Sequence, residues 1–176
     1  MKILVTAFKP FNNQNINYSM EVLNFINNVD KLIVDVIYDN CYLQIINNVN
    51  LDEYDLVVSL GEARSRDVLT LEVLAHNISS CSLKDNSGIL KQNETINSSM
   101  PENLKTKVCL DNCIEVVKLS NDAGKFVCNN LYFHLLENYP EKAIFIHIPN
   151  CYNNEIEYKK YAKQIELIIS KLSVNL

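Results

Sequence analysis

Residues 121–129 read Asn-Asp-Ala-Gly-Lys-Phe-Val-Cys-Asn, and this stretch joins two segments of different periodicity. The apolar run before it, residues 113–119, predicts a strand. Three leucines after it recur at helical spacing and predict a helix that begins near Cys128. The free N–H groups and the positive dipole end of a helix favour a thiolate. The stretch therefore predicts a strand, a turn and a helix, with Cys128 as a candidate nucleophile at the helix N-terminus.

Strand and helix patterns alternate along the rest of the chain. Runs of apolar residues predict further strands at residues 2–7, 32–38, 54–60, 70–77 and 143–148. Helical spacing predicts a helix over residues 20–27, with Ser19 as its N-cap, and an amphipathic helix over residues 158–172. The polar residues 84–99 predict one long irregular loop.

This alternation predicts an α/β fold with helices on both faces of a mixed, mostly parallel central sheet. The 176 residues contain no internal repeat and no linker. That length suits one core, so we expect a single domain over residues 1–176, with three α/β/α layers.

Composition excludes several classes of protein. The net charge is -5 and no basic stripe is present, so we expect no nucleic-acid partner. No apolar segment has the length that a bilayer span needs, and residues 1–5 are too short an apolar stretch for a signal peptide. The six cysteines are scattered without a Cys-x-x-Cys pair, which predicts reduced thiols and no metal site. We therefore expect a cytoplasmic protein that does not bind membranes.

A nucleophilic Cys128 needs a base, and the chain has three histidines. His134 follows Cys128 by six residues, which is out of phase on a helix. His76 alternates with Glu72 along one predicted strand. His147 lies near the end of the strand at 143–148, at the sheet edge where residues 61 and 124 emerge, so position favours His147. Glu72 interrupts an apolar run and belongs either to a solvated face or to a site; spacing alone leaves both open.

Five blocks of the sequence, in order over about residues 2–150, resemble the pyroglutamyl peptidase I family, also called pyrrolidone-carboxylate peptidases. They are Ile-Leu-Val-Thr-Ala-Phe-Lys-Pro-Phe at 3–11, Ser-Leu-Gly-Glu-Ala-Arg-Ser-Arg at 59–66, Leu-Glu-Val-Leu-Ala-His-Asn at 71–77 with Asp-Asn-Ser-Gly at 85–88, Asp-Ala-Gly-Lys-Phe-Val-Cys-Asn at 122–129, and Phe-Ile-His-Ile-Pro at 145–149.

The resemblance implies a cysteine peptidase that removes N-terminal pyroglutamate from peptides. Carried over by position, it implies Cys128 as nucleophile, His147 as base and Glu72 as the acid that orients the imidazole. An acyl-enzyme would form and be hydrolysed, without a metal or cofactor. The family also implies a homo-oligomer, such as a tetramer.

The resemblance further implies a slot for the uncharged lactam ring of the substrate. Side chains around the ring would come from Phe8, Phe11, Phe126 and Val127. Backbone groups of Glu62 would bond the lactam, and Asn17 would lie nearby. Without the resemblance, core packing is the plainer interpretation of the phenylalanines.

Some positions depart from the family pattern. Family members usually have glycine at Ala7, a glycine pair at residues 12–13 and another at 64–65, and an arginine at Ser82. Asparagine, which occupies positions 12 and 13, tolerates left-handed backbone, whereas alanine and arginine do not. Two functions therefore remain open: an active peptidase with Cys128, His147 and Glu72, or a homologue that binds a peptide or small molecule without hydrolysis.

Overall fold

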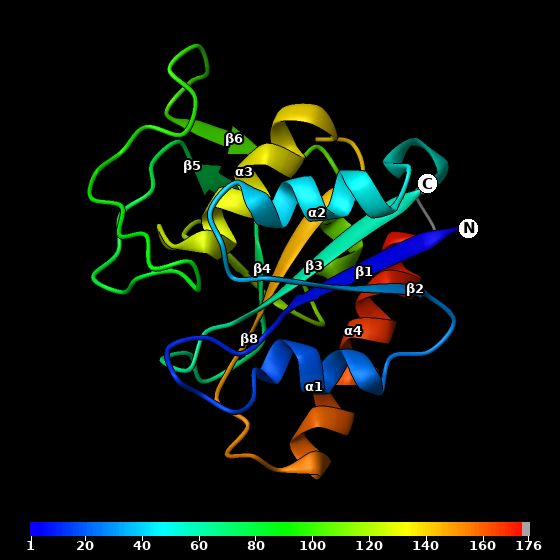
Figure 1. Ribbon diagram of the computed structural model, residues 1–176. Helices are drawn as coiled ribbons and strands as arrows, with labels where there is room; N and C mark the ends of the chain where they lie inside the picture. The colour runs from blue at the N-terminus through cyan, green and yellow to red at the C-terminus, as the bar shows by residue number, and fades with distance from the viewer. Residues whose placement is uncertain (174–176) are drawn as a thin grey trace.

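A six-stranded sheet in the order β2-β1-β3-β8-β4-β7 runs through the centre of the computed structural model, which describes residues 1–173 (Figure 1). The antiparallel pair in this sheet is β4 with β8, and the other neighbours are parallel, as predicted. The strands are β1 (Ile3–Phe8), β2 (Asp30–Val34), β3 (Leu56–Glu62), β4 (Thr70–Glu72), β7 (Lys118–Ser120) and β8 (Ala143–Ile148).

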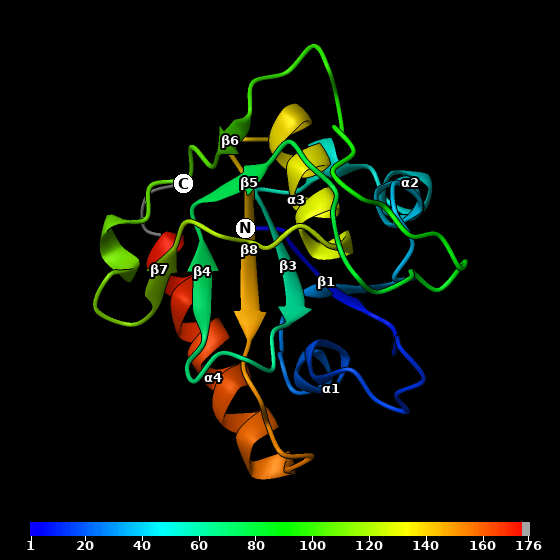
Figure 2. The same cartoon turned by 90° about the vertical axis from the view of Figure 1, so that its left-hand side faces the viewer.

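Two helices cover each face of the sheet, which gives the predicted three layers (Figures 1 and 2). Helices α1 (Tyr18–Asn24) and α4 (Glu155–Leu172) cover one face, and α2 (Asn40–Asn48) and α3 (Val127–Asn138) cover the other. Strands β1 and β8 are buried along their whole length because both of their faces carry helices. Within residues 1–173, no helix combines the length and apolarity needed to cross a membrane.

Helix α4 confirms the amphipathic pattern read from the sequence. The six apolar residues at helical spacing are all buried against the sheet: Tyr158, Tyr161, Ile165, Ile168, Ile169 and Leu172. The N-cap predicted for α1 is wrong. Asn17 is the cap, and its Oδ1 accepts hydrogen bonds from the backbone N–H and the hydroxyl of Ser19.

The strand predicted over residues 70–77 is in fact two short strands. β4 ends at Glu72, and β5 (Leu74–His76) pairs with β6 (Asn103–Lys105) in a separate two-stranded sheet beside α3 (Figure 2). Val73 lies at the break. Its N–H donates to the Ser120 carbonyl at 2.7 Å, and its own carbonyl accepts from the N–H of Thr106 at 3.0 Å. The chain changes sheets here without a glycine or proline.

The strand predicted over residues 113–119 is largely wrong. A 3-10 turn, η2 (Asp111–Cys113), ends where the strand was expected to begin, and the strand that follows, β7, starts only at Lys118. Cys113 and Val117 are buried without being in a strand, which explains the apolar pattern. A second 3-10 turn, η1 (Leu51–Glu53), precedes β3. Residues 84–99 contain no helix or strand, as predicted.

Backbone conformation agrees with the departures from the family pattern. Asn12 and Asn13 have φ of 53° and 58°, in the left-handed region that asparagine tolerates. Ala7 lies within β1 with its side chain buried, and neither Ala7 nor Arg64 is among the described residues with positive φ. The side chains at 7 and 64 therefore cause no backbone strain.

Candidate active site

Cys128 is the second residue of α3, as the sequence predicts. The residue after it fixes the start of the helix. The Asn129 side chain accepts from the N–H of His76 at 2.7 Å and donates to the carbonyls of His76 and Ile78. No side chain caps the helix at Phe126. The first N–H groups of α3 are thus held in place close to the thiol.

His147 and Glu72 form a buried pair across strands β8 and β4. Register places Thr70 opposite His147 and Glu72 opposite Phe145, so that Glu72 and His147 are diagonal neighbours on one face. The distance from Nδ1 of His147 to Oε1 of Glu72 is 2.8 Å. The Glu72 side chain is fully buried. Because an ionised carboxylate only accepts hydrogen bonds, Nδ1 carries the proton and Nε2 is left as an acceptor.

Gly61 brings Cys128 and His147 to the same place. It lies on β3 directly opposite His147 in the parallel register. A Cβ atom added at Gly61 would lie 3.0 Å from the sulfur of Cys128. Both Cys128 and His147 also line a single cavity. The thiol and the imidazole are therefore neighbours at the carboxyl ends of β3 and β8.

Burial dominates the ionisation of this cluster. Burial, with Glu62 and Glu72 nearby, raises the pKa of the Cys128 thiol to about 12. Burial also lowers the pKa of His147, although Glu72 opposes that shift. Burial is the largest influence on Glu72 and acts to raise its pKa, but the hydrogen bonds from His147 and Ser120 and the nearby charge of Arg66 act against burial, and the pKa is lowered overall. The resting pair is therefore a neutral thiol and a neutral imidazole; the thiolate expected from the helix terminus is outweighed by desolvation.

Arg66 is a member of this cluster that the sequence did not single out. Its guanidinium donates to Oε1 of Glu72 and to the hydroxyl of Thr70, and its Nη2 donates to the Asp122 carbonyl at 2.6 Å. The sequence shows only an arginine shortly after the end of a predicted strand. Its partners Glu72 and Asp122 are six and 56 residues away, so their contacts with Arg66 could not be predicted from spacing.

The cavity beside Cys128 has a volume of about 110 Å³. That is the volume of roughly four water molecules in the liquid, so the cavity suits one small ring. It brings together most of the residues predicted for the ring slot, with four that were not predicted. The lining consists of Phe8, Phe11, Asn17, Val36, Glu62, Ala123, Gly124, Lys125, Phe126, Cys128 and His147.

Two predicted binding residues, Val127 and Glu62, have side chains that are occupied by other contacts. Val127 is buried in the core under α3 and does not line the cavity. The Glu62 carboxylate is already engaged, since it accepts from the N–H of Tyr18 at 2.7 Å and from Nε of Arg64 at 2.6 Å. Its side chain therefore fixes the start of α1 to the end of β3, which leaves only its backbone to meet a ligand. Asn17, the α1 cap, lines the cavity next to it.

The remaining histidines are engaged elsewhere. His134 lies 3.1 Å from Asp39, and His76 lies 2.7 Å from Asn103. Ser82 lines a separate hollow with the left-handed residues Asn12 and Asn13, and not the cavity of Cys128. No cluster of three potential metal ligands occurs in the described part of the chain.

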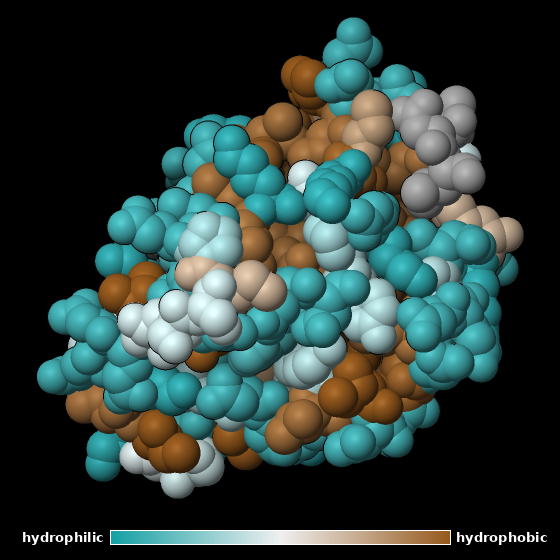
Figure 3. Space-filling model, turned by 90° about the horizontal axis from the view of Figure 1, so that it is seen from above, coloured by the Kyte–Doolittle hydropathy of each residue, from teal (hydrophilic) through white to brown (hydrophobic). Residues whose placement is uncertain are grey.

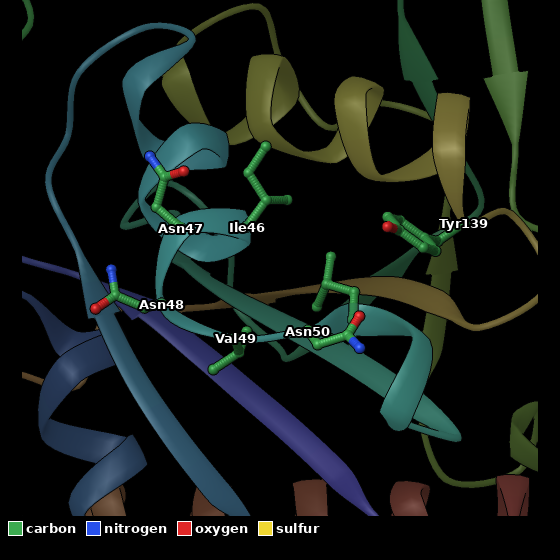
Figure 4. A pocket seen from close by; sticks show the side chains of 7 residues that line it. Ile46, Asn47, Asn48, Val49, Asn50 and Tyr139 are labelled. Atoms are coloured by element: carbon green, nitrogen blue, oxygen red, sulfur yellow. The ribbon is translucent and has the colours of Figure 1, made fainter.

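A larger hollow near the end of α2 lacks catalytic groups. It measures about 430 Å³, and Figure 4 shows the side chains that line it, which include Tyr139 and the residues at and just beyond the end of α2, 46–50. Seen from above the view of Figure 1, the surface of the molecule is mostly hydrophilic, with apolar residues in several patches (Figure 3). Neither a thiol nor an imidazole lines this hollow, so the cavity at Cys128 is the candidate active site.

The sequence of this chain is similar to those of known proteins. The family model described as pyroglutamyl peptidase matches residues 1–174. A pyrrolidone-carboxylate peptidase of Thermoanaerobacter sp. (strain X514) is 34% identical over 85% of this chain and 82% of its own length. That of Staphylococcus aureus is 32% identical over 85% and 79%.

Solved structures share the fold. The pyroglutamyl peptidase I of Bacillus amyloliquefaciens superposes with a TM-score of 0.84 at 21% identity, covering 98% of this chain and 95% of the other. The pyrrolidone carboxyl peptidase of Thermus thermophilus gives 0.83 at 23% identity, over 95% and 98%. With the family model spanning nearly all of the sequence, the chain belongs to the pyroglutamyl peptidase family of cysteine peptidases.

Proposed function

We propose that this protein removes pyroglutamate from the N-terminus of peptides, with Cys128 as nucleophile, His147 as base and Glu72 as the group that orients His147. The observation that carries the proposal is the His147–Glu72 pair, which lies beside Cys128 at a cavity of single-ring size. Family membership supports the substrate class.

The chemistry begins from the neutral pair. Nε2 of His147 takes the proton of the Cys128 thiol as the sulfur attacks the carbonyl carbon of the pyroglutamyl residue. His147 then gives this proton to the leaving nitrogen, the C–N bond breaks, and a thioester to Cys128 remains. Water, deprotonated by His147, attacks the thioester and releases pyroglutamate and the free thiol. Glu72 keeps the proton on Nδ1 throughout, which holds Nε2 ready to accept.

Two features of the cavity assist these steps. N–H groups at the start of α3, which no side chain caps, stabilise the oxyanion that forms on the attacked carbonyl. Phe8, Phe11 and Phe126 surround the lactam ring, which is uncharged and loses little on leaving water for an apolar slot. The ring amide bonds backbone groups near Glu62.

The test uses a fluorogenic pyroglutamyl amide under reducing conditions. We expect release of the fluorophore by the natural protein, none by Cys128→Ser, and loss of release after treatment with iodoacetamide. The other five cysteines are unchanged in Cys128→Ser, so the absence of release by that variant would assign the activity to Cys128. Mass spectrometry of the Cys128 peptide shows whether the loss after iodoacetamide follows alkylation of that thiol. No release by folded natural protein would indicate the alternative function, a homologue that binds without hydrolysis.

We also propose a cytoplasmic homo-oligomer, such as a tetramer. All six cysteines are free, as in a reducing compartment. Apolar side chains are exposed on α2, where Leu43 and Ile46 are 47% and 39% accessible. Sedimentation of the natural protein tests the assembly, because a single species of about 20 kDa would contradict it.

A further inference from the structure

We propose that Arg66 is a positioning residue of this site, which neutralises Glu72 and joins it to the loop that carries Cys128. The inference depends on the proposed function for its kinetic consequences, but not for its structural ones. Arg66 lies in the turn between β3 and β4. Its one guanidinium contacts the Thr70 hydroxyl, the Glu72 carboxylate and the Asp122 carbonyl.

The first task of Arg66 is charge compensation. Glu72 is fully buried, and a buried carboxylate needs a cation close to it to remain ionised. His147 cannot be that cation in the resting site, because burial keeps its imidazole neutral. Arg66 is charged at every accessible pH and is itself only 21% exposed. It therefore supplies the charge that keeps Glu72 an acceptor for His147.

The second task is geometric. Arg66 donates to the carbonyl of Asp122, which lies at the start of the loop that leads into α3. The Asp122 carboxylate accepts a hydrogen bond from the N–H of Gly124 at 2.9 Å, two residues further along this loop. One planar fork thus connects β4 with the loop before Cys128. Nη1 donates to Glu72 and Nη2 donates to Asp122, and the single ammonium nitrogen of a lysine cannot reproduce these two hydrogen bonds.

Other charged groups around Glu72 and His147 are few. Besides Arg66, the titratable groups that act on this pair are Cys128 and Tyr132 from α3 and Asp122 from the preceding loop, with Glu62 from β3 acting on the thiol. The Asp122 carboxylate is largely exposed and is paired with His76. Arg66 is therefore the cation in direct contact with this pair within the described residues.

The test compares Arg66→Met and Arg66→Lys with Lys107→Met, a control that removes a cation from the exposed Lys107–Glu141 pair. For Arg66→Met we expect kcat/KM on the fluorogenic amide to fall about 100-fold, mostly in kcat. The acid limb of the pH profile of kcat/KM should move to higher pH in this variant, because loss of a positive charge makes Glu72 and His147 easier to protonate. Arg66→Lys should restore the acid limb but not the full kcat. Lys107→Met should match the natural protein.

A second measurement does not need turnover. Alkylation of Cys128 by iodoacetamide, followed by mass spectrometry of its peptide, should be slower in Arg66→Met than in the natural protein between pH 7 and 10, because Arg66 lowers the pKa of the thiol. An unmoved acid limb with kcat within twofold, or alkylation at the natural rate, overturns the proposal. Full rescue by Arg66→Lys overturns the geometric part. If the natural protein cleaves nothing, the proposed function fails and alkylation alone decides the role of Arg66.

Discussion

Gly61 on β3 lies directly opposite His147 on β8, and no side chain fits at position 61. An added Cβ would be 2.8 Å from the Phe145 ring and 3.0 Å from the Cys128 sulfur. Phe145 is fully buried and cannot swing away. We therefore predict that Gly61→Ala loses about 1–3 kcal/mol of unfolding free energy and displaces the thiol, with a large loss of kcat. Urea unfolding and turnover of the fluorogenic amide measure both.

Gly88→Ala is the matched control for Gly61→Ala. Gly88 has φ of +88°, and nothing lies within 4 Å of an added Cβ. Alanine there is strained in the backbone by about 1–2 kcal/mol, but it touches no group of the site. We expect lower stability with unchanged kcat. If kcat of Gly61→Ala equalled that of the natural protein, the packing around the Cys128 thiol would be loose, which contradicts the close contacts at position 61.

Glu72→Gln keeps the shape of the side chain and removes its charge. The amide can no longer enforce the proton on Nδ1 of His147, and Arg66 loses its ionic partner. We predict a fall in kcat/KM of about 10²- to 10⁴-fold, the range of a lost acid–base function. Glu53→Gln, in the exposed pair with Lys2, serves as the control and should leave kcat/KM unchanged. A fall of less than threefold in Glu72→Gln would remove Glu72 from the mechanism.

The strand at 143–148 and the helix over 158–172 could be predicted because their patterns are local. A run of five apolar residues and His147 ends just before Pro149, and the apolar residues on one face of the helix recur at helical spacing. The strands at 70–77 and 113–119 could not be predicted correctly, since their limits depend on distant partners. Val73 changes sheets because Ser120 and Thr106 bond its backbone.

The difference between local patterns and distant contacts also explains which parts of the candidate site could be predicted from the sequence. Cys128 and His147 carry recognisable chemistry and could be proposed from their positions on a predicted helix and strand, whereas the role of Glu72 was implied by the family resemblance. Arg66 acts through contacts with residues 72 and 122 that no spacing reveals. The ionisation of Cys128 could not be predicted either. Burial of the thiol raises its pKa more than the helix terminus, which the sequence indicates, can lower it.

That raised pKa predicts how alkylation of Cys128 depends on pH. A thiol with a pKa of about 12 is mostly protonated below that pH, so its thiolate fraction rises about tenfold per pH unit. We expect the alkylation rate to keep rising from pH 7 to 10, whereas that of free cysteine levels off above about pH 9. Mass spectrometry of the Cys128 peptide after timed iodoacetamide treatment measures the rate. A rate independent of pH near neutrality would show a thiolate–imidazolium pair instead.

Tyr132 joins the helix of the nucleophile to the strand of the acid. It is four residues after Cys128 on α3, and its buried hydroxyl donates to the Glu72 carbonyl at 2.8 Å. Tyr132→Phe leaves that carbonyl without this donor, so we predict a loss of about 1–3 kcal/mol of unfolding free energy and a lower kcat, because α3 can then shift against β4. Tyr54→Phe, whose hydroxyl donates to Asp30 away from the site, should lose at most about 1–3 kcal/mol and keep its kcat. Equal kcat in the two variants, measured beside urea unfolding, would mean that β4 and α3 keep their alignment without this hydrogen bond.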